Sequence, residues 1–518
     1  MEVDLPSYSA NEPAIHRLVD DILECIFLLN ATTSPTEHAT TVASSQVCTR
    51  WRSIALNCHT IWGLIIDYPR HSLKWIETLL DRSNPSSLDF GSRINSVYLG
   101  DGPDGGERVL ELVFNHIIRL RTFNLQVPFF TWELVRSRFF QLPAPNIEFV
   151  HVSFLGIAGH LTHPLFDNNA PKLRKLGLLR CSVDFTSPVL TPLTELYVHT
   201  ARRKNTVSVL DWLNILGGMP SLRWVTLVNA ISSAPANDVC PVIHLGALDM
   251  LSIDGPFHEC VTLVNHLIMP PRCGLRLRCD HVNLGFDQRP LWAIIKKKID
   301  SYAKNAPNRN LIASSFYSSV TIKNVLHGPF DDSSGWATEA REVHNQQYPH
   351  LLDPVLTIKL RLSNPQDSFP LFLSLFALFE RTFFDTTYLC LWIYYDVDDG
   401  ADVFLPLVDS LRVFENLEML HLVHESLVKL LLPLLQRANS VLFPAVKSIY
   451  FRDVTFDQTS DLLLRLTEFL QWRREQGFPI QKIVIEGCRT NRKDVPTHIQ
   501  GTVVEIDDFG YPDSDAIE

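Results

Sequence analysis

Three short segments hold residue types that could do chemistry. GDGPDGG at Gly100–Gly106 has the glycines of a phosphate-binding loop but lacks its lysine, so it is typical of a flexible turn. DVDDG at Asp396–Gly400 resembles a calcium loop, yet its glycine comes one position early and Leu407 replaces the bidentate acid, which favours a solvated loop. His421 and His424 flank an expected strand and are typical of surface or hydrogen-bonded core residues rather than ligands. With no GxSxG or HExxH motif either, we expect no enzyme and no cofactor.

Cysteine spacing and net charge exclude further classes of site. The ten cysteines include no CxxC, and the closest pair is Cys273 and Cys279, which argues against zinc sites and disulfide frameworks. A formal charge of -11 disfavours a nucleic-acid partner, because phosphate binding needs a basic surface. The short basic runs at 202–204 and 296–298 indicate solvated faces, with a nuclear import signal as the alternative. We therefore expect neither metal nor nucleic acid.

The apolar segments are predicted to lie in the protein core rather than to span a membrane. The longest apolar run, PLFLSLFALF at Pro370–Phe379, is too short to span a bilayer. The first residues, MEVDLPSYSANEPAIHR, lack a basic region followed by an apolar one, so no secretory signal is expected. These features predict a cytoplasmic or nuclear protein without a membrane partner.

Two amphipathic segments stand near the N-terminus. In Ile15–Leu29, apolar residues at helical spacing form one face, and Leu23 and Phe27 widen it; that face holds Leu18, Ile22, Ile26 and Leu29. ATTSPTEHATT then interrupts the pattern. In Ser44–Trp62 a second helical stripe consists of Val47, Trp51, Ile54, Ala55 and Cys58. Residues 15–68 are thus predicted to form a compact unit of two or three helices, after a flexible segment at 1–14.

This unit is too small to bury both apolar faces internally. The apolar surface that the unit cannot bury must be covered either by the rest of this chain or by another protein. The residues alone leave both possibilities open.

Beyond residue 68 the sequence contains a recurring pattern of apolar residues. Segments of the form L-x-x-L-x-L centre on residues 97, 123, 150, 176, 196, 225 and 251, with steps of 26, 27, 26, 20, 29 and 26. Helix-like stretches lie between them, and Pro145, Pro171 and Pro220 are placed to end those helices before the next strand. A unit of helix, turn and short strand repeated in this way predicts an α/β solenoid.

The repeat divides the remaining chain into four segments. Residues 69–272 form the first part of the expected solenoid, and 273–350 are polar and aperiodic, which predicts an irregular insertion. The pattern resumes over 351–490, in YLCLWI, LEMLHL, VKSIYF and IQKIVI. Residues 491–518 are expected to be an acidic tail.

The N-terminal region resembles an F-box of the fungal type. The match consists of Leu18, Ile22, Leu23, Ile26 and Phe27, followed by a run similar to the family's Q-V-C-R-x-W-R-x-I-A, and by Ile61 and Trp62. The residues of that run are Gln46, Val47, Cys48, Arg50, Trp51, Arg52, Ile54 and Ala55. Val19 stands where the family usually has proline, in a leucine-proline corner that normally lies in the adaptor interface. Asp21 replaces the usual glutamate.

The later region is similar to leucine-rich repeats, whose consensus continues to a buried Asn or Cys. LRKLGLLRCSV fits with Leu173, Leu176, Leu178 and Cys181, and IQKIVIEGC places Cys488 at the equivalent position. The resemblance implies that both cysteines are structural, with their side chains in the repeat core.

Together the resemblances imply a substrate receptor of an SCF ubiquitin ligase. The F-box would bind a Skp-type adaptor and through it a cullin-RING ligase, while the solenoid would bind an unknown protein substrate. The residues expected to bind the adaptor are Leu18, Val19, Ile22, Leu23, Ile26, Phe27, Val47, Trp51, Ile54 and Trp62. The alternative is a non-catalytic repeat scaffold for protein–protein interaction, whose N-terminal helices only cap the solenoid.

Overall fold

The computed structural model describes a mixed α/β protein with extensive parallel sheet. The described residues are 14–33, 37–64, 71–91, 97–98, 103–128, 131–156, 159–160, 164–200, 206–233, 239–282, 289–303, 310–316, 319–325, 356–362, 368–380, 385–393, 404–437, 441–454, 456, 461–486 and 496–507. The chain divides into two compact units, Met1–Thr206 with Gly218–Leu222, and Val207–Gly217 with Arg223–Glu518. Cys488 and the DVDDG segment lie outside the described residues.

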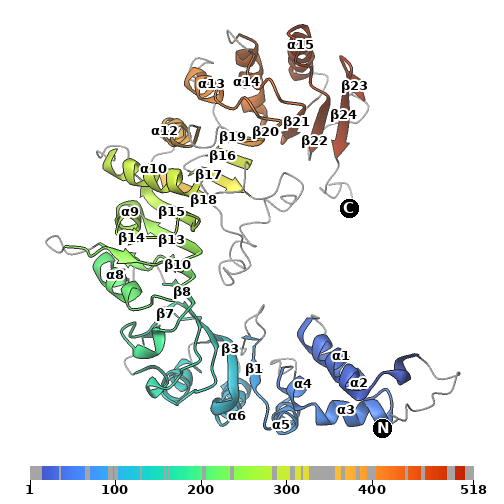
Figure 1. Ribbon diagram of the computed structural model, residues 1–518, viewed down its shortest axis with the longest axis vertical. Helices are drawn as coiled ribbons and strands as arrows, with labels where there is room; N and C mark the ends of the chain where they lie inside the picture. Colours follow the sequence, from blue (N-terminus) through green and yellow to red (C-terminus); the bar gives the residue numbers. More distant parts are fainter. Residues whose placement is uncertain are drawn as a thin grey trace, which may run out of the picture. The chain divides into compact units, whose positions relative to one another are not determined.

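The first unit begins with short helices (Figure 1). They are the 3-10 turn η1 (Ala14–Arg17), α1 (Asp20–Thr33), α2 (Glu37–Ser44), α3 (Thr49–Asn57), α4 (His59–Leu64) and α5 (Leu73–Arg82). Asp20 and Asp21 lie in the first turn of α1, where acidic groups are favoured by the helix dipole.

Three predictions for this region are wrong in detail. The first helix begins at Asp20 rather than Ile15, and the expected interruption is shorter because α1 continues to Thr33 and α2 begins at Glu37. The segment Ser44–Trp62 is not one helix, because Cys58 ends α3 and its N–H donates to the Ile54 carbonyl at 3.0 Å. Four α-helices, rather than two or three, therefore lie between residues 15 and 68.

Parallel strands follow in the first unit. They are β1 (Leu88–Phe90), β2 (Val97–Tyr98), β3 (Leu120–Val127), β4 (Phe149–Phe154), β6 (Lys175–Leu179) and β8 (Glu195–His199), with the short pair β5 (Gly159–His160) and β7 (Cys181–Ser182). The central register joins Phe123, Val150, Leu176 and Leu196, all of them buried. The predicted L-x-x-L-x-L segments therefore form strands that place their apolar residues on one face.

Irregular helical segments cover that apolar face. They are α6 (Pro103–Phe114), η2 (Ile117–Arg119), α7 (Trp132–Leu134), the π-helical η4 (Val135–Phe139), η5 (Leu165–Asn168) and η6 (Pro188–Leu190). Phe139 stacks on Phe123 of β3 with ring centroids 3.9 Å apart, and Phe114 stacks on Phe139 at 5.5 Å. Because α6 begins at Pro103, the second half of GDGPDGG is the first turn of a helix, and the prediction of a flexible turn is wrong there.

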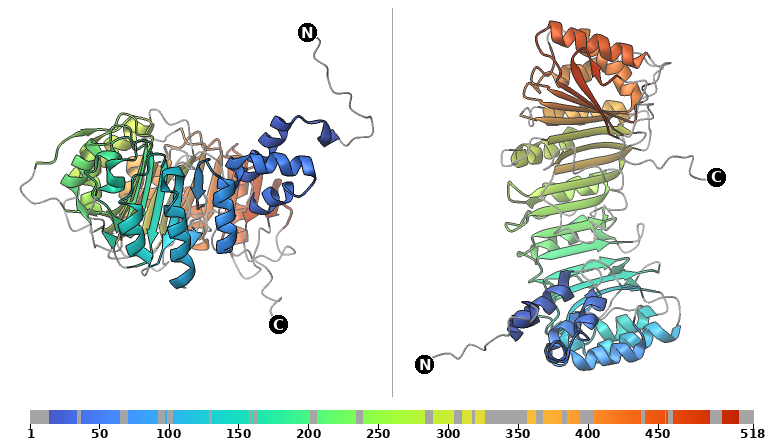
Figure 2. Two further views of the ribbon diagram at one scale, coloured as in Figure 1. Left: turned by 90° about the horizontal axis from the view of Figure 1, so that it is seen from below. Right: turned by 90° about the vertical axis from the view of Figure 1, so that its right-hand side faces the viewer.

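The second unit contains the remaining strands. They are β9 (Val207–Ser208), β10 (Trp224–Val228), β11 (Ile231–Ser232), β12 (Ile243–His244), β13 (Met250–Pro256), β14 (Leu267–Ile268), β15 (Gly274–Val282), β16 (Asn310–Phe316), β17 (Ser319–Val325), β18 (Leu356–Leu362), β19 (Tyr388–Ile393), β20 (Met419–Val423), β21 (Ser448–Arg452), β22 (Lys482–Glu486), β23 (His498–Ile499) and β24 (Thr502–Asp507). Figure 2 shows the long strands side by side. Their order is β10, β13, β15, β18, β17, β16, β19, β20, β21, β22, β24, β23.

Helices lie on one side of these strands (Figure 1). They are α8 (Val209–Gly217), α9 (Phe257–Asn265), α10 (Arg289–Ala303), α12 (Ser368–Glu380), α13 (Leu405–Leu411), α14 (Glu425–Arg437) and α15 (Leu462–Glu475). The apolar run at Pro370–Phe379 lies in α12, where Leu371, Phe372, Leu375 and Phe376 are fully buried. It is core, as predicted. No helix among the described residues is long and apolar enough to cross a membrane.

The expected irregular insertion at 273–350 contains regular structure. β15 continues the parallel pairing from β13, and β16 and β17 form an antiparallel hairpin that lies between β18 and β19. Every second residue is buried, namely Leu311, Ala313 and Ser315 in β16 and Val320 and Ile322 in β17. The prediction failed because this alternation has a period of two, whereas the repeat was sought as L-x-x-L-x-L. Residues 326–355 lie outside the described part.

The expected acidic tail also forms part of the sheet. β24 pairs in parallel with β22, in a register that places Val504 beside Ile483, and β23 pairs with β24 as a short hairpin. Val504 and Ile499 are buried. The prediction of a tail is therefore wrong for 498–507, where the apolar residues Ile499, Val503, Val504 and Ile506 accompany only two charged ones.

A left-handed residue recurs directly after the strands. Arg180, Asn229, His424 and Asp453 have φ between 52° and 86° and follow β6, β10, β20 and β21. The Asn229 N–H donates to the Asp254 carbonyl at 2.8 Å, so the turn remains bonded to the next strand. Asn and Asp tolerate this conformation better than most residues, and β-branched residues tolerate it worst. The turn is thus a local signal for the end of each strand.

Asn229→Val should lower the free energy of unfolding by about 1–2 kcal/mol, because a β-branched residue is strained at φ 52°. Asn229→Gly should change it by less than about 1 kcal/mol. Urea unfolding of the full chain, monitored by circular dichroism, measures both changes. Equal effects of Val and Gly would show that the backbone conformation does not limit stability here.

Candidate functional site

An exposed apolar stripe runs along α1. Val19 is 56% exposed, Ile22 46% and Leu29 61%, and Ile26 between them is half-buried. The exposed Ile15 precedes them, so the five residues follow one another at steps of four, three, four and three. Ile22, Ile26 and Leu29 have the spacing of one side of α1, as in the contact seam of packed helices, and Ile15 in η1 and Val19 just before α1 continue that spacing. We call these five residues the α1 stripe.

A different side of α1 forms the small core of the N-terminal helices. Leu23, Phe27 and Ala31 on this side are buried. α1 therefore has two apolar sides, of which the part of the chain that the structure describes covers only one. An exposed apolar area of this kind is typical of an interaction site.

Val47, just before helix α3, and two residues of α3 give the N-terminal helices further apolar surface. Val47 is 58% exposed, and Trp51 and Ile54 are half-buried. The Trp51 ring meets the Phe27 ring edge-on, with centroids 5.3 Å apart, so the tryptophan spans the core and the surface. The Trp51 indole N–H is buried and has no hydrogen-bond partner within the described structure.

Three of the ten residues expected to bind an adaptor are core residues instead. Leu23 and Phe27 are buried beneath α1, and Trp62 is completely buried. The Trp62 indole N–H donates to the Ala55 carbonyl at 2.8 Å, and the Arg82 guanidinium lies 4.7 Å from its ring centroid. The prediction is corrected because the break at Cys58 lets α4 fold back and bury Trp62. Leu18, Val19, Ile22, Ile26, Val47, Trp51 and Ile54 keep at least part of their surface.

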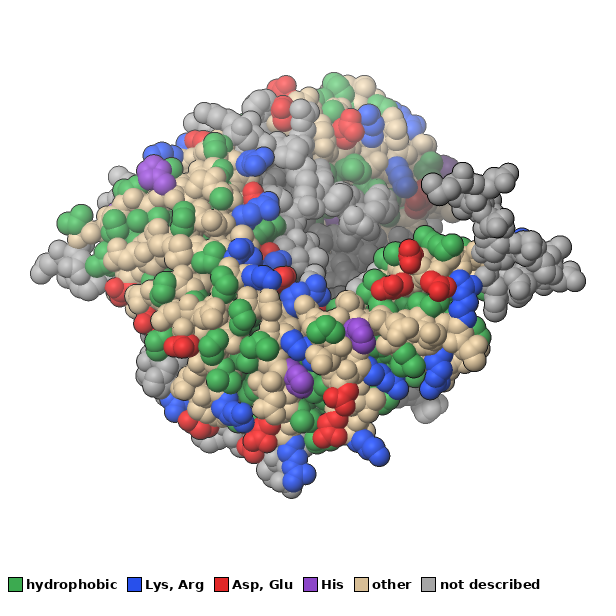
Figure 3. All heavy atoms as spheres, turned by 60° about the horizontal axis from the view of Figure 1, so that its bottom comes forward, with side chains coloured by type: hydrophobic (Ala, Val, Ile, Leu, Met, Phe, Trp, Pro, Cys, Tyr) green, Lys and Arg blue, Asp and Glu red, His purple; other side chains and the backbone are tan. Residues whose placement is uncertain are grey.

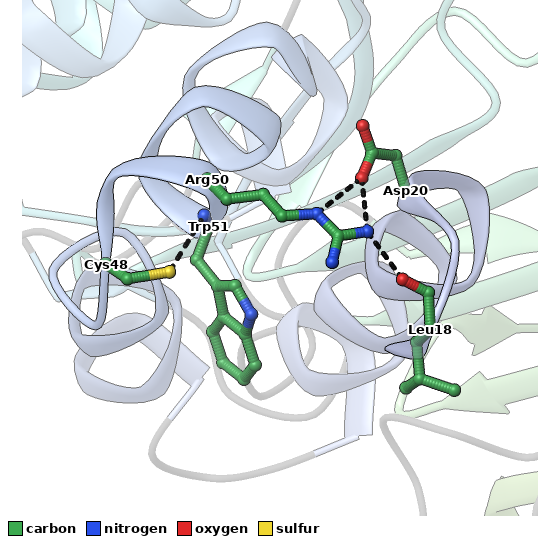
Figure 4. A network of polar contacts seen from close by, with 5 residues as sticks. All are labelled: Leu18, Asp20, Cys48, Arg50 and Trp51. Atoms are coloured by element: carbon green, nitrogen blue, oxygen red, sulfur yellow. Dashed lines mark hydrogen bonds and ion pairs between the residues drawn. The ribbon is translucent and has the colours of Figure 1, made fainter. Parts of the chain in front are cut away.

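A polar network joins the beginnings of α1 and α3 (Figure 4). Arg50 Nε donates to Asp20 Oδ1 at 2.9 Å, and Arg50 Nη2 donates to the same oxygen at 2.6 Å and to the Leu18 carbonyl at 2.5 Å. The Cys48 thiol caps α3 by accepting from the Trp51 N–H at 3.5 Å. These contacts set the position of the α1 stripe relative to Val47 and Trp51.

Acidic residues border the stripe. Asp21 and Glu24 on α1 are exposed, whereas Asp20 pairs with Arg50. In Figure 3 hydrophobic and acidic side chains lie next to each other over the N-terminal helices, at the right of the view. A partner that covers the stripe would therefore meet negative charge at its edge.

Helix α4 fixes the N-terminal helices to the first strand. A Cβ on Gly63 would lie 2.3 Å from the Ser87 carbonyl oxygen just before β1, so only glycine permits this close approach. Arg119 donates to the Ser86 carbonyl at 2.9 Å and to the Ser83 hydroxyl at 2.7 Å, which holds the same junction. α4 and α5 thus use their apolar surface within the first unit, and the α1 stripe does not.

The repeat positions singled out in the sequence are buried wherever the structure describes them, which leaves out Cys488. Leu173, Leu176, Leu178 and Cys181 all lie in the core of the first unit. The Cys181 thiol donates to the Val152 carbonyl at 3.5 Å, and burial raises its pKa to about 12, so the unreactive thiol form is favoured.

Two histidines are buried on the strands. His421 Nδ1 lies 3.1 Å from the Tyr388 hydroxyl, and His151 Nδ1 lies 3.0 Å from Asn124 Oδ1. Burial lowers the pKa of His421 to about 3, with a further contribution from Arg452, and burial lowers that of His151 to about 4. His424 adopts the left-handed turn after β20. Among the described residues no group of three or more His, Cys, Asp or Glu could hold a metal ion.

Comparison of the sequence with family models and with curated proteins found no match. The candidate site is therefore defined by its own geometry, which is the exposed apolar surface of the N-terminal helices.

Ile22→Asp should leave the N-terminal helices folded, because Ile22 lies on the exposed side of α1. Leu23→Asp should unfold them, because it places a charge in the small core at a cost of several kcal/mol. Hydrogen exchange of the α1 amides in the two variants measures the difference. If both variants keep slow exchange, the assignment of the two sides is wrong.

Acidification should destabilise the fold through His421. Its pKa is near 6.5 in the unfolded chain and lower in the folded one, so the unfolded state binds the proton first as the pH falls. Between pH 7 and pH 5 this costs up to about 2 kcal/mol, and His421→Gln should remove that part of the pH dependence. Urea midpoints at the two pH values test this, with the exposed His244→Gln as the control. An unchanged pH dependence in His421→Gln would contradict the assignment.

Proposed function

We propose that this chain is a substrate-recognition subunit of an SCF-type E3 ubiquitin ligase. In this proposal the N-terminal helices are an F-box that binds a Skp-type adaptor, and the adaptor links the chain to a cullin and a RING subunit. The observation that carries the proposal is the α1 stripe, an apolar surface that the described chain leaves exposed beside Val47 and Trp51. The resemblance of these same segments to the F-box pattern supports it.

The physical case for a protein partner rests on area and shape. Apolar area contributes about 25 cal/mol per Å² when it is removed from water, so a row of Ile, Val and Leu side chains is a strong driving force for association. The ring of half-buried Trp51 already packs against Phe27, which restricts its side-chain conformation. Less side-chain entropy is therefore lost when Trp51 becomes part of an interface. The stripe therefore suits a partner that presents an apolar groove.

The repeat region would act as the substrate receptor. We propose that its parallel strands form a leucine-rich-repeat-like solenoid, which is supported by the in-register pairing of short strands and by the recurring left-handed turn. The reaction would be accelerated by proximity, because the receptor holds a protein substrate close to a ubiquitin-charged enzyme and does no chemistry itself. A cytoplasmic or nuclear location belongs to the same proposal.

The alternative function is a repeat scaffold whose N-terminal helices only cap the strands. One observation favours a capping role, namely the close approach of Gly63 to the chain before β1. However, that contact involves α4, and it leaves the α1 stripe exposed. Capping therefore accounts for α4 and α5 but not for the apolar side of α1.

The full chain, co-expressed with a fungal Skp-type adaptor, should be captured with the adaptor in equal amounts. Ile22→Asp combined with Val47→Asp should reduce capture at least tenfold, because both charges would be buried in the interface. Leu464→Asp, a change at an equally exposed leucine on α15, is the matched control and should not affect capture. If the unmodified chain captures no adaptor, the proposed function fails and the scaffold is favoured.

A further inference from the structure

We propose that Arg50 is a positioning residue that holds the corner at Leu18 and Val19 in the conformation needed for partner binding. This inference rests on the proposed function, since it assigns Arg50 a role in forming the adaptor surface. It goes beyond that function by explaining how the surface is ordered although proline is absent at position 19.

The corner is a two-residue joint between helical segments. η1 ends at Arg17, the chain bends at Leu18, and α1 begins at Asp20. The Val19 carbonyl accepts from the N–H groups of Ile22 at 3.1 Å and Leu23 at 3.2 Å, so this carbonyl takes part in the first hydrogen bonds of α1. The Leu18 carbonyl accepts from the Arg50 side chain instead. The joint is thus held from outside the helix by a side chain of α3.

This joint lies within the proposed interface. Ile15 precedes the joint, Val19 is part of it and Ile22 follows it in α1. A change in backbone angle at Leu18 or Val19 would therefore separate the first residues of the α1 stripe from the rest. Keeping the joint fixed lowers the entropy cost of binding a partner.

Valine alone does not fix this joint. A proline ring locks φ near −65°, and proline is the residue that the resemblance places at position 19. Valine leaves φ free to vary over the broad allowed region. A non-covalent constraint is therefore required if the stripe is to be ordered before binding.

The arginine side chain supplies that constraint on both sides of Val19. Its Nη2 bridges the Leu18 carbonyl and the Asp20 carboxylate, and its Nε also donates to Asp20. A planar guanidinium can make this forked contact, whereas a lysine ammonium acts as a single point charge. Because Arg50 belongs to α3, the same contact holds α1 beside Val47 and Trp51.

The ion pair itself adds little to global stability. The Arg50 and Asp20 side chains are 37% and 65% exposed, and exposed pairs contribute about 0–1 kcal/mol. The expected effect is therefore on the local order of α1 and on partner affinity rather than on unfolding of the repeat region. This separates positioning from a purely structural role.

A proline at position 19 offers a direct rescue. In the described part of the chain the Val19 N–H makes no hydrogen bond, so Val19→Pro removes none. Leu18 and Val19 are both non-helical, which is compatible with proline and with the residue before it. If Arg50 acts by fixing the joint, the covalent constraint should replace it.

The experiment measures the affinity of the full chain for a purified Skp-type adaptor and the exchange rates of the Ile22 and Leu23 amides without adaptor. Arg50→Ala should weaken binding about tenfold and speed up exchange in α1. Arg50→Ala with Val19→Pro should return both values to within about threefold of the unmodified chain. Arg50→Lys should behave like Arg50→Ala, and Arg52→Ala, which removes an exposed arginine on the same helix, should change neither.

The proposal is overturned if Arg50→Ala leaves affinity and exchange unchanged, or if Val19→Pro restores neither. Loss of affinity without faster exchange would show a direct contact between Arg50 and the adaptor, and would also overturn it. Failure of the unmodified chain to bind any adaptor would count against the proposed function alone. In that case faster α1 exchange in Arg50→Ala, reversed by Val19→Pro, would still support the positioning role.

Discussion

The whole structure depends on keeping short parallel strands in register. Each strand buries only a few apolar residues, such as Val150 and Leu176, and these meet one helical layer only when neighbouring strands are aligned. A shift of one residue would turn every apolar side chain to the other face of the sheet. Opposite charges on neighbouring strands add to this pairing: Lys175 and Glu195, which are register partners, lie 2.5 Å apart, and Lys482 and Glu505 lie 2.7 Å apart.

The same constraint determines what the N-terminal helices can do. A row of parallel strands must be closed at its first strand, and α4 does this by approaching β1 at Gly63. Once α4 has buried its apolar residues against β1 and α5 has buried its own against α4 and α6, α1 and α3 have too little interior to cover all of theirs. The exposed α1 stripe is thus a consequence of a small helical unit whose limited core is already filled by Leu23, Phe27 and Trp62.

The sequence predicted the strands well because their apolar spacing is local. Every L-x-x-L-x-L segment with a described strand lies at or within a few residues of the expected place, as for LRKLGL and β6. The hairpin of β16 and β17 was missed because its buried residues recur with a period of two and one of them, Ser315, is polar. β24 was missed because the prediction rested on the polar composition of 491–518 as a whole, which conceals the short apolar segment with Val503, Val504 and Ile506.

The candidate site was predictable only in part. Helical spacing identified Ile22, Ile26 and Leu29 as one face, but it gave no sign of whether that face would be covered. The burial of Trp62 depends on the break at Cys58, which no local pattern marks. The contact between Arg50 and Leu18 joins residues 32 positions apart and involves a backbone carbonyl, so it leaves no trace in composition or spacing.

The most direct test of the account is hydrogen–deuterium exchange of the full chain with and without a purified Skp-type adaptor. The account predicts that the adaptor slows exchange in α1 and at the beginning of α3 and leaves the strands of both units unchanged. Slower exchange confined to the strands, with no effect on α1, would contradict it.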